Sequence, residues 1–301
     1  MAIYNGNQKV KPSGIGKVYV GSTLVYESSS ITGDLYFEAT SSSTVGYNRS
    51  GLAESDIEME YSINGASWQS WDGTAISLAS GDKMYVRNNH ATLSVGLYNY
   101  FNFVLTGSLK AVGNIMALLN GATSITQNYS FVNLFDGQSA LTDISGLELP
   151  ATTLADGCYK YMFYGCTGLT SLPSNLLPAT TLVYECYHGM FYNCSGITSI
   201  PSGFLSATSL AEYCCIYMFR GCTSLTNLPA NLLPATTLAN KCYSCMFYDC
   251  TSLNVSEGSG TRLIFTCPST SGLTGPTEFM FHNTAGSFTG APTAGNSYYN
   301  N

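Results

Sequence analysis

The sequence predicts an α+β protein, in which an all-β N-terminal part is followed by a short solenoid of 28-residue repeats. The β prediction rests on short apolar runs separated by Gly, Asn, Asp and Ser in residues 31–108. The solenoid prediction rests on a 28-residue period, because a unit of that length cannot bury its apolar face alone and must stack on its neighbours. Two series of cysteines keep this period: Cys158, Cys186, Cys214 and Cys242, and Cys166, Cys194, Cys222 and Cys250.

Residues 1–30 are predicted to form an anchoring arm. Apolar and polar residues alternate in 17–20 and again in 23–27, on either side of Gly21-Ser22, which is typical of a β-hairpin. A hairpin of this size is not stable alone in water, so the arm is expected to pack on another surface.

Residues 31–108 are expected to form a small β-sandwich of about seven strands. Five strand-like runs cover residues 35–40, 57–63, 75–78, 83–87 and 98–105. Asn64-Gly65 is the strongest hairpin signal in the chain, because both residues tolerate the positive φ of a tight turn.

Each repeat is predicted to contain one short helix and one short strand. Leu154, Cys158 and Met162 lie four residues apart, the spacing of one helical stripe. Gly165 would end the helix, and a strand over 169–172 would end at Pro173. The solenoid is expected over residues 109–288, with degenerate terminal units at about 121–148 and 261–288 and a polar tail at 289–301.

Composition narrows the class of protein. Only 10% of the residues are charged and the formal net charge is −7, with no basic run to contact phosphates, so nucleic-acid binding is not expected. The sequence has no apolar run long enough to cross a membrane and begins with no secretory signal. A charge-poor chain with 22 Tyr suits a fibre, an adhesin or a virion surface better than a cytosolic enzyme.

The eight cysteines of the two series are predicted to be reduced, buried thiols that fill tight positions between repeats; Cys215, Cys245 and Cys267 lie outside the series. Disulfides along a column are the alternative, although they would need good geometry at every step and the total is odd. Cys242 and Cys245 resemble half of a zinc site, but no second pair or His cluster completes it. We therefore predict no metal and no cofactor.

No catalytic constellation is visible in the sequence. His90, His188 and His282 are far apart and belong to no known motif. Glu58 and Glu60 alternate on a predicted strand; a glycosidase pair could look like this, but a solvated strand face is the favoured interpretation. The chain is accordingly predicted not to be an enzyme.

A candidate binding face is inferred from the predicted helix. Residue 164 would lie about 200° around the helix from buried Met162, so its column would face outward, and so would residue 160, one turn earlier. Tyr and Arg are good contact anchors, and this face could bind a glycan or a partner protein. Alternatively, the Tyr side chains only cover neighbouring apolar surface. The candidate residues are Tyr164, Tyr192, Arg220, Tyr248, Lys160 and His188.

The units LPATTL…CYxxMFxxCTSLTxLP resemble the BspA-like leucine-rich repeats, in a version common in gut Bacteroidetes and their phages. The resemblance covers about residues 121–288. The segment GKVYVGSTLVYE is similar, over a shorter stretch, to the opening of many tailed-phage virion proteins. These resemblances imply a leucine-rich-repeat fold and transfer no catalytic residues.

The function that they imply is that of a non-enzymatic virion protein of a crAss-like phage. It would be a head fibre, tail fibre or decoration protein, with the repeats projecting to bind a host-surface glycan or protein. Residues 1–30 would then dock to other virion proteins, and a homotrimer is slightly favoured over a monomer. The alternative is a bacterial cell-surface adhesin whose signal peptide is missing from this sequence.

Overall fold

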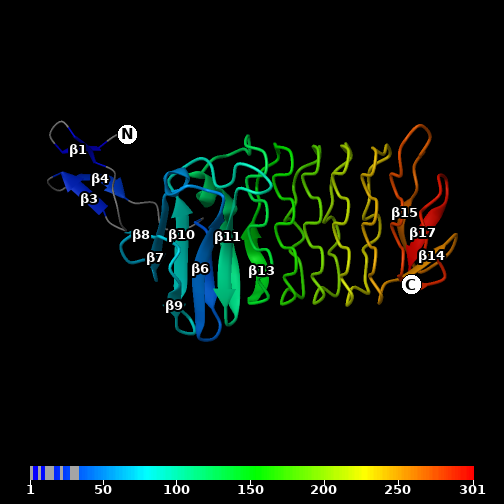
Figure 1. Cartoon of the computed structure of the whole chain (residues 1–301), viewed down its shortest axis with the longest axis horizontal. Coiled ribbons are helices and arrows are strands. Elements are labelled where there is room, and N and C mark those ends of the chain that lie inside the picture. The colour runs from blue at the N-terminus through cyan, green and yellow to red at the C-terminus, as the bar shows by residue number, and fades with distance from the viewer. Residues whose placement is uncertain (1–2, 6–7, 11–16, 21–22, 28–33) are drawn as a thin grey trace.

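The computed structural model describes residues 3–5, 8–10, 17–20, 23–27 and 34–301, and it is β-rich (Figure 1). Strands account for 26% of the residues and helical segments for 3%, and the described residues contain no α-helix. Three sheets are formed within residues 34–301, and none of them forms a solenoid. The prediction of an α+β fold with a leucine-rich-repeat solenoid is therefore wrong.

The N-terminal strands form two antiparallel pairs. Strand β1 (Ile3–Asn5) pairs with β2 (Gln8–Val10), and β3 (Lys17–Val20) pairs with β4 (Thr23–Glu27). The second pair agrees with the predicted hairpin. Its turn residues, Gly21 and Ser22, lie outside the described residues, as do residues 1–2, 6–7, 11–16 and 28–30 of the predicted arm.

The largest sheet has six strands in the order β13-β12-β5-β10-β7-β8. All neighbours are antiparallel except β12 and β13, which are parallel. Asn64 and Gly65 follow β7 with φ of 52° and 78°, as the turn signal predicted. The strands are β5 (Tyr36–Ala39), β7 (Met59–Ile63), β8 (Gln69–Ser70), β10 (Lys83–Asn88), β12 (Leu109–Asn114) and β13 (Leu141–Glu148).

A second sheet has the order β11-β6-β9, formed by β11 (Tyr100–Thr106), β6 (Ser43–Ser50) and β9 (Ile76–Leu78). It packs on the first sheet through aromatic rings: the Phe37 and Phe103 centroids are 4.8 Å apart, and those of Tyr47 and Trp71 are 4.7 Å apart. Two 3₁₀ segments, η1 (Glu54–Asp56) and η2 (Ile115–Leu119), accompany these sheets. The sequence did not predict β6, because its residues STVGYNRS are mostly polar.

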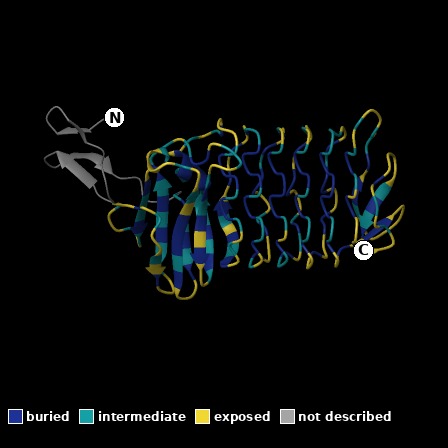
Figure 2. Cartoon of the chain, viewed as in Figure 1, coloured by how far each residue is buried: buried dark blue, intermediate teal, exposed yellow. Residues whose placement is uncertain are grey.

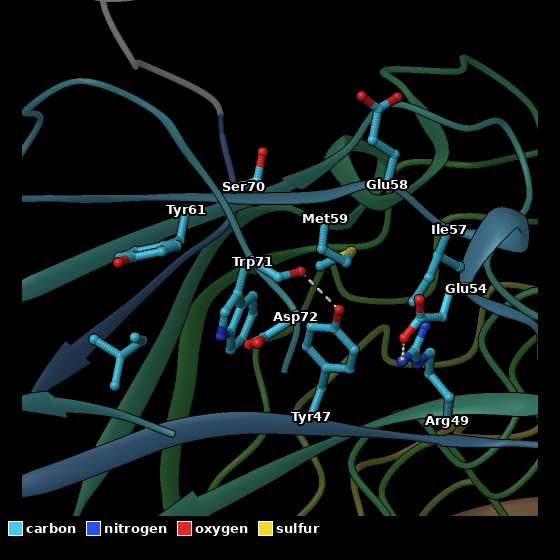
Figure 3. Close-up of a pocket in the computed structure, with 11 residues that line it drawn as sticks. Tyr47, Arg49, Glu54, Ile57, Glu58, Met59, Tyr61, Ser70, Trp71 and Asp72 are labelled. Atoms are coloured by element: carbon cyan, nitrogen blue, oxygen red, sulfur yellow. Dashed lines mark hydrogen bonds and ion pairs between the residues drawn. The ribbon is translucent and has the colours of Figure 1, made fainter. Parts of the chain in front are cut away.

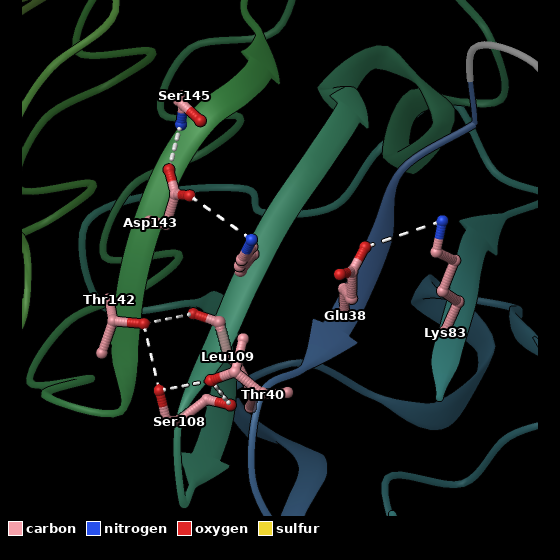
Figure 4. A network of polar contacts seen from close by, with 9 residues as sticks. Glu38, Thr40, Lys83, Ser108, Leu109, Thr142, Asp143 and Ser145 are labelled. Carbon is pink, nitrogen blue, oxygen red and sulfur yellow. Dashed lines mark hydrogen bonds and ion pairs between the residues drawn. The ribbon is translucent and has the colours of Figure 1, made fainter. Parts of the chain in front are cut away.

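Hydroxyl groups join β13 to the rest of its sheet at the ends of β5 and β12 (Figure 4). Thr40 Oγ1 donates to Ser108 Oγ at 2.7 Å, and Ser108 Oγ lies 3.2 Å from Thr142 Oγ1. Thr142 Oγ1 also donates to the carbonyl oxygen of Leu109 at 3.2 Å. The segment that begins the repeats is therefore continuous with the N-terminal sheet.

Each repeat contains a run of tight turns where a helix was predicted. We call residues 155–166, 183–194, 211–222 and 239–250 the turn segments. Within a segment, alternate amides bond three residues back, as from Cys158 N to Ala155 O at 3.2 Å. The intervening amides bond to the next repeat, as from Tyr159 N to Cys186 O at 3.1 Å. Successive repeats are thus joined by backbone hydrogen bonds between their turn segments.

The four-residue spacing that predicted a helix has a different cause in this structure. Every fourth residue of a turn segment is left-handed, including Gly157, Tyr161 (φ 55°) and Gly165. Left-handed residues cannot continue a right-handed helix. Each one changes the direction of the backbone, so that side chains four residues apart point the same way. The strand predicted for residues 169–172 is also absent, and the later repeats contain only isolated bridges, such as Ser199 with Asn227.

One hydrophobic core runs from the N-terminal sheets through the repeats (Figure 2). A series of buried phenylalanine rings runs along this core. From Phe135 onward they are nearly parallel, with centroids 5.3 to 5.7 Å apart. The members, in order, are Phe37, Phe103, Phe135, Phe163, Phe191, Phe219, Phe247 and Phe281.

A four-stranded sheet closes the C-terminal end, in the order β15-β17-β14-β16. The predicted polar tail at 289–301 is wrong, because this region contributes β17, where Tyr298 and Asn300 are buried. The Asn300 side chain accepts a hydrogen bond from Leu228 N (2.9 Å) and donates to Thr226 O (3.1 Å). The strands are β14 (Asn254–Glu257), β15 (Arg262–Thr266), β16 (Ala285–Gly286) and β17 (Ser297–Asn300).

Candidate functional site

The predicted binding column is half-buried, and it lies along the turn segments. Tyr164, Tyr192, Arg220 and Tyr248 occupy equivalent positions in successive repeats, each next to a left-handed residue. The ring centroids of Tyr164 and Tyr192 are 5.0 Å apart, with the planes inclined by 72°. Because the turn segments are hydrogen-bonded to one another, these side chains are held in register.

Arg220 is surrounded by aromatic faces. Its guanidinium carbon lies 4.4 Å from the ring centroid of Tyr248, 5.2 Å from that of Tyr192 and 5.5 Å from that of Tyr217. Asp249 lies 3.9 Å from Arg220 Nη2. Cation–π contacts restrain the guanidinium while leaving part of it in solvent. We call Tyr164, Tyr192, Tyr217, Arg220 and Tyr248 the aromatic strip.

The structure extends this strip to residues that the sequence did not suggest. His282 stacks on Tyr248 with centroids 4.6 Å apart, and the half-exposed Phe279 lies 6.0 Å from His282. Both belong to a further turn segment, residues 273–284, which a six-residue insertion takes out of the 28-residue register. Tyr217 was missed because its column changes from Tyr to Gly189 and Cys245, so no shared residue type marked it.

Lys160 and His188 do not face solvent, and this part of the prediction is wrong. They are 6% and 8% exposed. Both contact Glu185: Lys160 Nζ lies 2.7 Å from one carboxylate oxygen, and His188 Nδ1 lies 3.0 Å from the other. His188 Nε2 lies 3.0 Å from Tyr161 Oη. The two residues thus form a buried polar network that supports Tyr161.

Electrostatics in this network favour an ionised Glu185 carboxylate beside a neutral His188 imidazole. Burial would raise the pKa of Glu185, but hydrogen bonds from His188 and Lys160 lower it to about 2. Burial lowers the pKa of His188; the hydrogen bond with Glu185 opposes that shift, and the charge of Lys160 adds to it. A buried ion pair satisfied in this way fixes geometry more than it adds stability.

The eight cysteines of the two series are buried and unpaired, as predicted. All eleven are free thiols in the structure. Burial raises the pKa of Cys158 and of Cys242 to about 12. Among the described residues, no group of three or more His, Cys, Asp or Glu side chains is placed to hold a metal ion, so Cys242 and Cys245 gain no further ligands there.

A separate hollow of about 420 Å³ lies beside β6 and β7 in the N-terminal sheets (Figure 3). Tyr47 Oη donates to the carbonyl oxygen of Trp71 at 2.8 Å, and Arg49 pairs with Glu54 at 3.0 Å. Glu58 lines this hollow, whereas Glu60 lies 2.7 Å from Arg87 Nη2. A carboxylate that is paired with an arginine is a poor nucleophile or acid. Glu58 and Glu60 therefore do not form a matched pair of carboxylates in this hollow.

The chain matches no protein-family model, no curated protein and no solved structure. No helical segment in the described part of the chain has the length and apolar character needed to cross a membrane.

Proposed function

We propose that this chain is a non-enzymatic structural protein of a phage particle, and that its repeats present a surface that adheres to the host cell. The observation that carries the adhesive part is the aromatic strip. Its members lie on backbone that is hydrogen-bonded from repeat to repeat, so little side-chain or backbone freedom is lost on binding. Tyr and Arg are also the residue types that contribute most at contact surfaces.

The particle assignment rests on sequence. The resemblance of the repeats to BspA-like units and of residues 16–27 to virion openings supports it, as does a composition with 10% charged residues. In this proposal residues 1–30 dock to a larger virion protein, and a homotrimer is the assembly. Both the head and the tail of a particle are compatible with such an arrangement.

The competing proposal is a bacterial cell-surface adhesin. It shares the adhesive strip and differs in how the chain is anchored. Deletion of residues 1–30 from the phage gene separates the two. We expect the shortened protein to fold but to be missing from purified particles; normal incorporation would contradict the docking role of the arm.

The adhesive role is tested with the full chain carrying a fluorescent label on host cells. Arg220→Ala and Tyr248→Ala should each reduce cell binding by about tenfold, because both remove anchors from the strip. Tyr184→Ala is the control, since Tyr184 is an exposed tyrosine outside the strip. Equal binding by all variants would contradict the adhesive role. Cleavage of a host polysaccharide by the purified chain would contradict its non-enzymatic part.

A further inference from the structure

The N-terminal end of the aromatic strip borders a hollow of about 480 Å³, formed where the loop before β11 meets the first repeats. The loop reverses direction between Gly96 and Asn99, and it carries Tyr98, which is 80% exposed. The lining is rich in tyrosine and includes one carboxylate: Tyr98, Tyr100, Asp136, Tyr161, Tyr164 and Tyr192.

The walls of this hollow are fixed relative to one another. Phe103 N in β11 donates to Leu134 O at 2.9 Å, and Leu105 N donates to Gln138 Oε1 at 2.7 Å. These bonds tie β11 to residues 129–138, which form the degenerate turn segment that precedes the repeats. The hollow is therefore built from two parts of the chain that hydrogen bonds hold together on one side.

The aromatic rings of the hollow stand at large angles to one another. Tyr161 and Tyr164 have centroids 5.8 Å apart and planes inclined by 88°, and Tyr164 meets Tyr192 at 72°. The buried network of Lys160, Glu185 and His188 holds Tyr161 through its hydroxyl group. The rings thus offer faces in more than one direction within a volume suited to a small ligand.

The polar part of the lining is acidic. Asp136 is half-buried, and among the contacts of the described residues its carboxylate has no ion pair and no hydrogen-bond donor. Burial raises its pKa. Asn133 lines the same hollow, and the described lining contains no Lys, Arg or His. Such a surface accepts hydrogen bonds from hydroxyl groups and repels anions.

We infer that this hollow binds a neutral, pyranose-containing glycan. The C–H bonds on one face of a pyranose ring carry partial positive charge and pack against the negative faces of tyrosine rings. The hydroxyl groups at the ring edge donate to the Asp136 carboxylate, which has lone pairs for several of them. A sulfated or carboxylated sugar would place its charge beside Asp136 without a cation to offset it.

This inference rests on the proposed adhesive function and names its ligand class. Titration calorimetry of the full chain would use four neutral trisaccharides, built from glucose, galactose, mannose or N-acetylglucosamine, and a sulfated form of each. At least one neutral trisaccharide should bind, and its sulfated form should bind at least about tenfold more weakly. Tetramethylammonium is included because aromatic walls beside a carboxylate also suit a compact cation.

Two variants and one control locate the site. Tyr98→Ala and Asp136→Asn should each weaken trisaccharide binding by about tenfold, whereas Tyr184→Ala, at an exposed tyrosine outside both the strip and the hollow, should leave it unchanged. Thermal unfolding of each variant checks that the fold is retained.

Other results would overturn the inference. These are the absence of binding by all neutral trisaccharides, binding that survives Tyr98→Ala and Asp136→Asn, and binding of tetramethylammonium alone. The host-cell assay keeps the two proposals apart. If Tyr98→Ala and Asp136→Asn still bind cells but Arg220→Ala and Tyr248→Ala do not, the adhesive function stands and the glycan hollow is wrong.

Discussion

At the scale of the residue, the second cysteine series contributes hydrogen bonds between repeats. Cys166 Sγ donates to the carbonyl oxygen of Phe135 at 3.0 Å, and Cys194 Sγ donates to that of Phe163 at 2.9 Å. A thiol is small enough for a tight interior and still offers a weak donor. Cysteine therefore recurs at these positions because it both fills the space and satisfies a carbonyl group of the preceding unit.

The thiols should be unreactive until the protein unfolds. Burial raises the pKa of the second-series thiols Cys166, Cys194, Cys222 and Cys250, so little of their thiolate exists at neutral pH, and all eleven cysteines are buried. Native protein treated with iodoacetamide should show no alkylation by mass spectrometry. Denatured, unreduced protein should show all eleven cysteines alkylated, and loss of most of that reactivity would instead indicate disulfides.

Tyr159 carries the one buried side-chain polar atom, among the described residues, that has no hydrogen-bond partner. Its hydroxyl group has lost water and gained nothing in return. Tyr159→Phe should therefore raise the free energy of unfolding by about 1 kcal/mol. Tyr47→Phe is the matched control, because the Tyr47 hydroxyl group does have a buried partner; it should lower stability by about 1 kcal/mol. Urea unfolding of both variants measures the difference.

His188 should make stability depend on pH. Its folded pKa lies below its ordinary value of 6.5, so below about pH 6.5 the unfolded chain binds more protons than the folded one. The stabilisation from a neutral His188 is thus present above pH 6.5 and is lost as the pH falls toward the folded pKa. His188→Gln should flatten the decline in melting temperature between about pH 7 and pH 5. His282→Gln should not, since His282 is exposed and outside the network.

At the scale of the element, left-handed residues shape the turn segment. Gly189 has φ of +59°, and an added Cβ would lie 2.3 Å from a Tyr161 ring carbon. Gly203 has φ of +72°, with nothing within 4 Å of the added atom. Gly203→Ala should cost about 1 kcal/mol from its backbone alone. Gly189→Ala should cost about 1–3 kcal/mol beyond that, because the ring must move. Equal thermal shifts would show that the ring contact is unimportant.

The sequence predicted which residues of the repeats are buried, but not the backbone conformation that buries them. Leu154, Cys158 and Met162 were correctly predicted to be buried. A helix and a turn segment with a left-handed residue at every fourth position both bring residues four apart onto the same side of the chain. The distinguishing signal is weak, because the left-handed position holds Tyr161 or Tyr217 as well as glycine. A tyrosine there does not indicate a positive φ.

Because of the same ambiguity, one part of the predicted binding face was correct and the other part was wrong. Residue 164 was expected to face outward and is partly exposed. Residue 160 was expected on the same face because a helix would place it there, but in the turn segment it points into the network with Glu185. Tyr98 and Asp136 could not be brought together from sequence, since that depends on how β11 is bonded to the first turn segment.

At the scale of the whole molecule, Phe135 joins the N-terminal sheets to the repeats. Its ring lies 6.2 Å from Phe37, 5.4 Å from Phe103 and 5.3 Å from Phe163. Phe135→Ala should lower stability by about 3–5 kcal/mol and should split thermal unfolding into two transitions, because the two parts lose their shared core. Phe247→Ala should cost about as much without separating the N-terminal sheets. A single calorimetric peak for Phe135→Ala would show that the two parts remain coupled by other contacts.

The register between turn segments also determines how the molecule can change in length. Each unit accepts and donates the same backbone bonds and places its phenylalanine ring 5.3 to 5.7 Å from the next. Removal of one whole period would therefore present Phe163 to Phe219 across a junction much like the one it lost. Gain or loss of 28 codons in the gene would lengthen or shorten the row of repeats by one ring spacing. The N-terminal sheets and the C-terminal sheet would stay the same. Such a protein can be lengthened or shortened in evolution without being redesigned.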